Sequence, residues 1–135
     1  MNDIVRRFHM AKAEYIDNNR YEFLRDLILS KEEAVMIAGL DPEDIPYLLR
    51  VRKLPFDALD EFARRGDERV MKAIAAKYPL LPETYEFLAS QNENVRTSLS
   101  CNKKLPAHLI ERFRHDESPL VREFVNATHP RDAHE

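Results

Sequence analysis

The stretch NVRTSLSCNKKLP, residues 94–106, holds the pattern that decides the fold of this chain. Its Val-Arg pair is followed by a Leu four positions after the Val, and then by a Leu-Pro pair. Apolar residues four apart lie on one face of a helix. The valines of this pattern recur at spacings of 25 and 26 residues, in Val70 with Ile74, Val95 with Leu99, and Val121 with Val125. We therefore expect three equivalent helices, each burying a Val and a second apolar residue.

Each of these helices has its own start signal and its own partner helix. A residue type that favours a helix N-cap stands three positions before each Val, namely Asp67, Asn92 and Ser118. Leu-Pro pairs at 54–55, 81–82 and 105–106 open a second set of helices. This set should bury Leu59 with Phe62, Tyr85 with Leu88, and Ile110 with Phe113. A period near 25 residues made of two short helices predicts a solenoid, because one helix pair cannot cover its own apolar face.

The predicted organisation is a single domain over residues 1–135. Residues 54–130 hold three helical repeats, residues 1–53 form an irregular helical cap, and residues 131–135 form a frayed tail. The predicted fold class is all-α, a right-handed superhelical solenoid of short helix pairs. The expected helices are 3–16, 20–29, 31–38, 42–51, 55–65, 68–77, 82–90, 93–102, 106–114 and 118–127.

The boundaries within the cap follow from local signals. Ser30 followed by Glu33 is a capping-box pattern, which predicts a helix start at residue 31. Gly39 suits the left-handed conformation that ends many helices. Asp41 followed by Pro42 predicts another start, because Pro at the first turn loses no hydrogen bond.

The composition is that of a globular domain and excludes several classes of protein. Charged residues make up 33% of the 135 residues and hydrophobic residues 44%, which is too apolar for disorder. Only two glycines are present, which argues against a Gly-rich phosphate-binding loop. No apolar run approaches the ~18 residues that span a bilayer, so we expect no membrane partner. A single cysteine, Cys101, forms no internal disulfide, and this predicts a cytoplasmic protein.

The charge is balanced overall and slightly uneven along the chain. The net charge is −3, and residues 52–80 carry 7 basic and 5 acidic residues, a local balance of +2. This balance is too small to be an electrostatic footprint for nucleic acid by itself. It leaves nucleic-acid binding open as an alternative.

The sequence VRTSLSCNKKLP resembles the leucine-rich repeat variant family and its HEAT-like relatives over about residues 54–130. The resemblance rests on the Leu-Pro corner, the apolar pair, the polar turn and the Val-Arg start. Arg96, Arg122 and Asn102 match the family's Arg and Asn, while Met71, Lys77 and Thr128 depart from it. The resemblance implies a helical repeat fold that hosts many binding roles. An iron–sulfur module attached to one such protein needs several cysteines, so no cofactor is predicted here.

Arg96 and Arg122 stand at the same place in successive repeats and have two interpretations. In the first, each Arg joins repeats by bonding a polar residue of a neighbouring turn, such as Asn92 or Asp116. In the second, they form a basic row for a partner's carboxylates or phosphates. Small residues on the Val-started helices favour the concave side of the solenoid for these helices. The predicted partner-binding residues on that side are Arg69, Lys72, Arg96 and Arg122.

No catalytic or metal-ligating constellation is apparent in the sequence. Adjacent acidic pairs point about 100° apart on a helix and do not converge, and Asp60 and Glu61 should pair with Arg64 and Arg65 four positions on. The histidines lack the spacing of a metal site. Cys101 aligns with Ala76 and Ala127, which predicts a small packed position rather than a catalytic thiol.

The predicted function is therefore a non-catalytic protein-binding scaffold or adaptor that uses the concave face of the repeats. Small proteins of this kind include inhibitors that confer immunity to a toxin, which the sequence does not distinguish from adaptors. The expected partner is a protein with an acidic surface. Nucleic-acid binding is the alternative, and an enzyme is the least favoured class. Nothing in the sequence specifies an oligomeric state.

Overall fold

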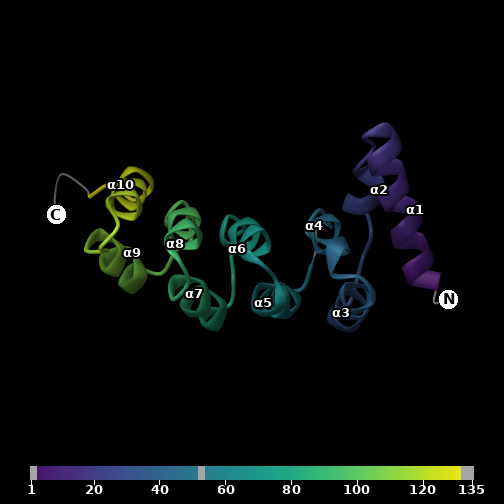
Figure 1. The fold of residues 1–135 in the computed structure, drawn as a ribbon, viewed down its shortest axis with the longest axis horizontal. Helices are drawn as coiled ribbons and strands as arrows, with labels where there is room; N and C mark the ends of the chain where they lie inside the picture. The colour runs from purple at the N-terminus through teal and green to yellow at the C-terminus, as the bar shows by residue number, and fades with distance from the viewer. Residues whose placement is uncertain (1–2, 52–53, 132–135) are drawn as a thin grey trace. The chain divides into compact units, whose positions relative to one another are not determined.

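The computed structural model describes residues 3–51 and 54–131, and these residues are all-helical (Figure 1). They form ten α-helices and one short 3-10 helix, with no strand among them. The all-α fold class is confirmed.

Contacts within the chain group it into two compact units, Met1–Gly66 and Asp67–Glu135. The first unit holds α1 (Asp3–Asn18), α2 (Glu22–Arg25), α3 (Lys31–Leu40), η1 (Pro42–Asp44), α4 (Ile45–Leu48) and α5 (Phe56–Arg65). The second unit holds α6 (Glu68–Ala75), α7 (Pro82–Ala89), α8 (Glu93–Ser100), α9 (Ala107–Arg114) and α10 (Pro119–Thr128).

In the first unit, α3 begins at the capping box that the sequence predicts. The Glu33 backbone N–H donates to Ser30 Oγ at 3.1 Å, and the Ser30 N–H donates to Glu33 Oε1 at 3.0 Å. The predicted end of this helix is wrong, because Gly39 lies inside α3 and no described glycine has a positive φ. Asp41 ends the helix instead, since its side chain accepts from the Glu43 N–H and begins η1.

Two helices of the first unit are shorter than expected. Within the predicted helix 20–29, only α2 is helical. The residues that follow α2 alternate between buried and exposed side chains. Leu27 and Leu29 are buried, while Ile28 between them is 78% exposed. This alternation suits an extended segment rather than a helix. The predicted helix 42–51 is divided between η1 and α4.

A buried ion pair joins α1 to η1. The apolar stripe of α1 includes Val5 and Phe8 and is buried as predicted. Lys12, on the same helix, places Nζ 2.6 Å from Oδ1 of the buried Asp44. The same ammonium lies over the Tyr47 ring, 5.6 Å from its centre. The stem of Lys12 thus crosses the apolar surface while its charge is compensated.

Three helices of the second unit begin at the N-caps that the sequence predicts. The N-cap side chains of α6, α8 and α10 each accept from the N–H of the Val three positions on: Asp67 from Val70, Asn92 from Val95 and Ser118 from Val121. The apolar pairs that these helices were expected to bury are all buried. Local capping and helical spacing together account for these three helices.

The helices of the second unit form two rows. Figure 1 shows α6, α8 and α10 in one row, with α7 and α9 in the other. Contacts join α6 to α8 and α8 to α10 directly. In α9 the buried pair is Leu109 with Phe113, whereas Ile110 is only half-buried. The prediction for this helix was wrong by one residue.

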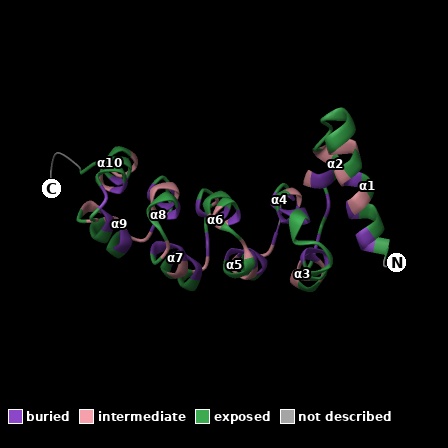
Figure 2. Ribbon diagram, in the orientation of Figure 1, coloured by how far each residue is buried: buried purple, intermediate pink, exposed green. Residues whose placement is uncertain are grey.

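Position within the row decides the exposure of equivalent residues. Ala75 of α6 and Ser100 of α8 are buried, and both lie five residues after the Val of their helix. Asn126 occupies the same place in α10 and is exposed. We attribute the difference to the row, since a further helix follows α6 and α8 but none follows α10 among the described residues. Figure 2 shows that each helix of this unit has a buried stripe and an exposed stripe.

Candidate partner-binding surface

The four residues predicted to bind a partner lie on the helices of one row and differ in exposure. Arg69 and Lys72 are exposed on α6. Arg96 of α8 and Arg122 of α10 are half-buried. The structure thus separates the four into two exposed cations and two half-buried arginines that bond other residues of the unit.

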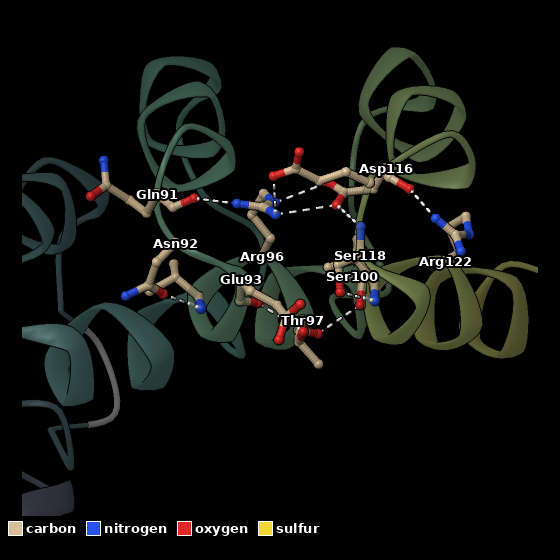
Figure 3. A network of polar contacts seen from close by, with 12 residues as sticks. Gln91, Asn92, Glu93, Arg96, Thr97, Ser100, Asp116, Ser118 and Arg122 are labelled. Atoms are coloured by element: carbon tan, nitrogen blue, oxygen red, sulfur yellow. Dashed lines mark hydrogen bonds and ion pairs between the residues drawn. The ribbon is translucent and has the colours of Figure 1, made fainter.

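Arg96 joins α8 to the turn before α10 (Figure 3). Its Nε donates to Asp116 Oδ2 at 2.9 Å, and its Nη2 donates to Asp116 Oδ1 at 3.2 Å. Its Nη1 donates to the Gln91 carbonyl oxygen at 2.7 Å. The side chains of Arg96 and Asp116 are only 16% and 11% exposed. Such a bidentate pair fixes orientation as well as distance, so Arg96 connects α8 to the turn before α10.

Asp116 organises the whole turn from residue 115 to residue 118. Its Oδ1 also accepts from the Ser118 N–H at 2.9 Å. Its backbone carbonyl accepts from Arg122 Nη1 at 2.5 Å. Arg96 and Arg122 therefore both bond Asp116. These contacts are of the kind expected if each Arg bonds a polar residue of a neighbouring turn.

A second polar junction connects the N-terminal ends of α6 and α8. Glu68 Oε1 accepts from Asn92 Nδ2 at 2.7 Å and from Asn94 Nδ2 at 3.1 Å. The hydrogen bonds from Asn94 and then Asn92 lower the pKa of the Glu68 carboxyl, because they stabilise its charged form. Sequence reasoning missed this junction, since its partners are 24 and 26 residues apart.

Asn102 makes a third junction at the opposite ends of these helices. It is fully buried, and its Nδ2 donates to the carbonyl oxygens of Ala75 and Lys77 at 3.0 and 2.7 Å. Its Oδ1 accepts from the Lys104 N–H at 2.9 Å. His129 Nε2 lies 2.9 Å from the Asn102 carbonyl oxygen. One side chain and its backbone thus connect the C-terminal ends of α6, α8 and α10.

Tyr85 of α7 extends this junction into the other row. Its hydroxyl donates to Asn102 Oδ1 at 3.4 Å and accepts from the Leu80 N–H at 3.3 Å. Burial raises the pKa of the Tyr85 hydroxyl above its ordinary value. The neutral hydroxyl is the form that can serve as both donor and acceptor here.

The junctions leave one side of α6, α8 and α10 exposed to solvent, which we call the outer face. Its exposed residues are Arg69, Lys72, Ala73, Ala76, Cys101, Leu120, Glu123, Phe124 and Ala127, and Thr97 and Ser98 on the same side are half-buried. Cys101, Ala76 and Ala127 are equivalent as predicted, but all three are exposed, so the expected packing of Cys101 was wrong. Leu120 and Phe124 are 47% and 40% exposed, which makes the α10 end of this face apolar.

The α6 end of the outer face is basic and only weakly compensated. Arg69 Nη2 lies 3.4 Å from Asp67 Oδ2, and both side chains are exposed. An exposed pair of this kind contributes little. The pKa of Asp67 is lowered chiefly by the Val70 N–H that it caps. The ammonium of Lys72 acts on Glu68 only through its charge.

Other parts of the structure hold further polar groups and open pockets. Arg64 and Arg65 pair with Asp60 and Glu61 at 3.0 and 2.9 Å, as predicted. No group of three or more metal-ligating side chains lies together in residues 3–51 and 54–131. None of the helices there is long and apolar enough to cross a bilayer. In the first unit, a cavity of about 330 Å³ is lined by Arg7, Met10, Ala11, Glu14, Phe23 and Leu27.

Comparison with known proteins leaves the site to be interpreted from its own geometry. No family model, no curated protein and no solved structure matches this chain.

Proposed function

We propose that this chain is a non-catalytic helical repeat scaffold that binds another protein through the outer face of α6, α8 and α10. The proposal rests on one main observation. Polar contacts between residues far apart in sequence join α6, α8 and α10. Arg96, Glu68 and Asn102 are each engaged within the second unit. Side chains on the outer face are left exposed.

The proposed architecture is a solenoid with a period of about 25 residues. Three features of the second unit support it: equivalent N-caps, equivalent buried apolar pairs and junctions between helices that are not adjacent in sequence. The difference between buried Ser100 and exposed Asn126 supports a row that ends at α10. The superhelical hand and the concave position of this face stay predictions.

The chemistry of the outer face favours a partner segment that carries both carboxylates and an apolar side chain. Arg69 and Lys72 at the α6 end suit carboxylates of the partner. Leu120 and Phe124 at the α10 end suit an apolar anchor, because exposed large apolar side chains that lie together are typical of interfaces. The small residues of α8 between them allow close approach of a backbone.

The test is capture of partners from native cells by tagged protein and by two charge-reversal variants. We expect R69E/K72E to weaken capture of the main partner about tenfold, a free-energy change of about 1.4 kcal/mol. The matched control is R6E/R7E, which makes the same charge change on exposed residues of α1. Equal capture by R69E/K72E and the parent protein, at unchanged thermal stability, would exclude this face as the binding site.

A further inference from the structure

Charge is segregated between the two ends of α6, α8 and α10. The turns at their N-terminal ends, residues 66–68, 90–94 and 115–118, contain five acidic residues and no Lys or Arg. The turns at their C-terminal ends, residues 76–81, 101–105 and 128–131, contain three Lys and one Arg and no acidic residue. Helix dipoles favour this arrangement, and it gives the second unit an acidic edge and a basic edge.

The basic turns lie next to one another in the structure. Asn102 donates to the Lys77 carbonyl oxygen at 2.7 Å, and its side chain accepts from the Lys104 N–H at 2.9 Å. The ring of His129 lies 2.9 Å from the Asn102 carbonyl oxygen. Buried Asn102 therefore gathers three turns that are 25 to 27 residues apart in sequence.

The cap at the end of α6 comes from Asn102. Asn102 supplies the donors for the carbonyl oxygens of Ala75 and Lys77 at the end of α6. Lys103 and Lys104 are exposed, and their ammonium groups contact no carboxylate among the residues that the structure describes. By contrast, Arg131 pairs with Glu111 at 3.3 Å. Within residues 3–51 and 54–131, Lys103 and Lys104 thus contribute two charges without an ion-pair partner.

We propose that this basic edge, formed by Lys77, Tyr78, Lys103 and Lys104, docks a short acidic segment of a partner protein. The inference rests on the proposed protein-binding function and adds a second contact surface to it. The ammonium groups attract carboxylates of the segment. Tyr78 is 50% exposed and offers an aromatic surface to an apolar side chain of the same segment.

The arrangement favours a short acidic peptide over nucleic acid. Helix α6 has 8 residues, and at ~1.5 Å per residue the acidic edge is about 12 Å away. That distance exceeds the Debye length of ~8 Å at physiological ionic strength, so exposed charges at one edge are largely screened from the other edge. A long polyanion that extends across the unit is repelled by the acidic edge, whereas a few carboxylates can stay on the basic edge.

The experiment is an NMR titration of the isotope-labelled full-length protein with a synthetic peptide of glutamates around one central leucine. We expect the largest amide shift changes at Lys77, Tyr78, Lys103 and Lys104. K103E/K104E should weaken binding about tenfold at low salt. R69E/K72E, which makes the same charge change on α6, should weaken it less than threefold. A peptide with glutamine in place of glutamate should not bind.

Each other outcome overturns the inference in a distinguishable way. Equal weakening by the two variants would show that net charge, not this edge, attracts the peptide. Shift changes confined to the outer face, or no shift change at millimolar peptide, would remove the basic edge as a docking site. Tighter binding of a DNA duplex through the same lysines would replace the acidic protein segment with nucleic acid. If K103E/K104E leaves capture of the cellular partner intact while R69E/K72E abolishes it, the proposed function stands and this inference fails.

Discussion

The Arg96 guanidinium on α8 donates two hydrogen bonds, of 2.9 and 3.2 Å, to the carboxylate of Asp116 in the turn before α10. The two residues are 20 positions apart and both are largely shielded from solvent. This pair places a charged contact where two helix pairs meet. It explains why an Arg at this position of a repeat can be structural, although its spacing alone also suits a binding residue.

Replacing Asp116 with Ala should destabilise the second unit by about 2 kcal/mol, below the range for breaking a fully buried pair because some solvent reaches these groups. The change removes the two carboxylate oxygens that accept from Arg96 and the acceptor of the Ser118 N–H. Urea denaturation followed by circular dichroism measures the loss. The control is Glu117→Ala, an adjacent carboxylate that lies 3.9 Å from Arg96 Nη2 but is 91% exposed, so its loss should cost less than about 0.5 kcal/mol. Similar losses in both variants would mean that the pair does not join the helices.

Replacing Asn102 with Ala should cost about 2–3 kcal/mol, because two buried carbonyl oxygens lose their donor. Asn102→Asp should cost at least as much, since a carboxylate then faces the carbonyl oxygens of Ala75 and Lys77. Thermal unfolding of the two variants beside Lys103→Ala provides the comparison. A melting temperature for Asn102→Ala equal to that of the parent would show that Asn102 is dispensable to the C-terminal junction.

The stability of the second unit should fall as pH falls through the acid range. Hydrogen bonds from Asn94 and Asn92 lower the pKa of Glu68 below its ordinary value of 4.5. Its contribution is therefore present above that value and is lost as pH drops through the lower pKa of the folded protein. Glu68→Gln should reduce the difference in denaturation midpoint between neutral and acidic pH. Glu93→Gln removes the same charge from the neighbouring helix start and is the control. An unchanged difference in Glu68→Gln would contradict the assignment.

Tyr85→Phe should destabilise the protein by about 1–2 kcal/mol at neutral pH, because the buried Leu80 N–H loses its acceptor. Burial raises the pKa of Tyr85 above its ordinary value of 10.0. Its contribution is therefore complete below that value and is lost as pH rises through the higher folded-state pKa. The variant should lose less stability than the parent above pH ~10. Denaturation midpoints at neutral and alkaline pH check both effects, and parallel curves would argue against a role for the hydroxyl.

The sequence by itself determined those parts of the fold that depend on neighbours within one helical turn. Asp67, Asn92 and Ser118 were recognisable as N-caps because the N–H they bind is three residues away. The buried apolar pairs of α6, α8 and α10 followed from a spacing of four residues. Such features depend on short-range hydrogen bonds and helical geometry, which the order of residues specifies.

Only the tertiary structure decided how the helices are joined and which side chains stay exposed. Asn102 and Glu68 bond residues more than 20 positions away in the sequence. Residue type alone does not specify such partners. Cys101 is exposed although its neighbours in the pattern suggested packing. The physical reason is that burial depends on which helix stands alongside. Ser100 and Asn126 show this directly, since equivalent positions differ in exposure where the row of helices ends.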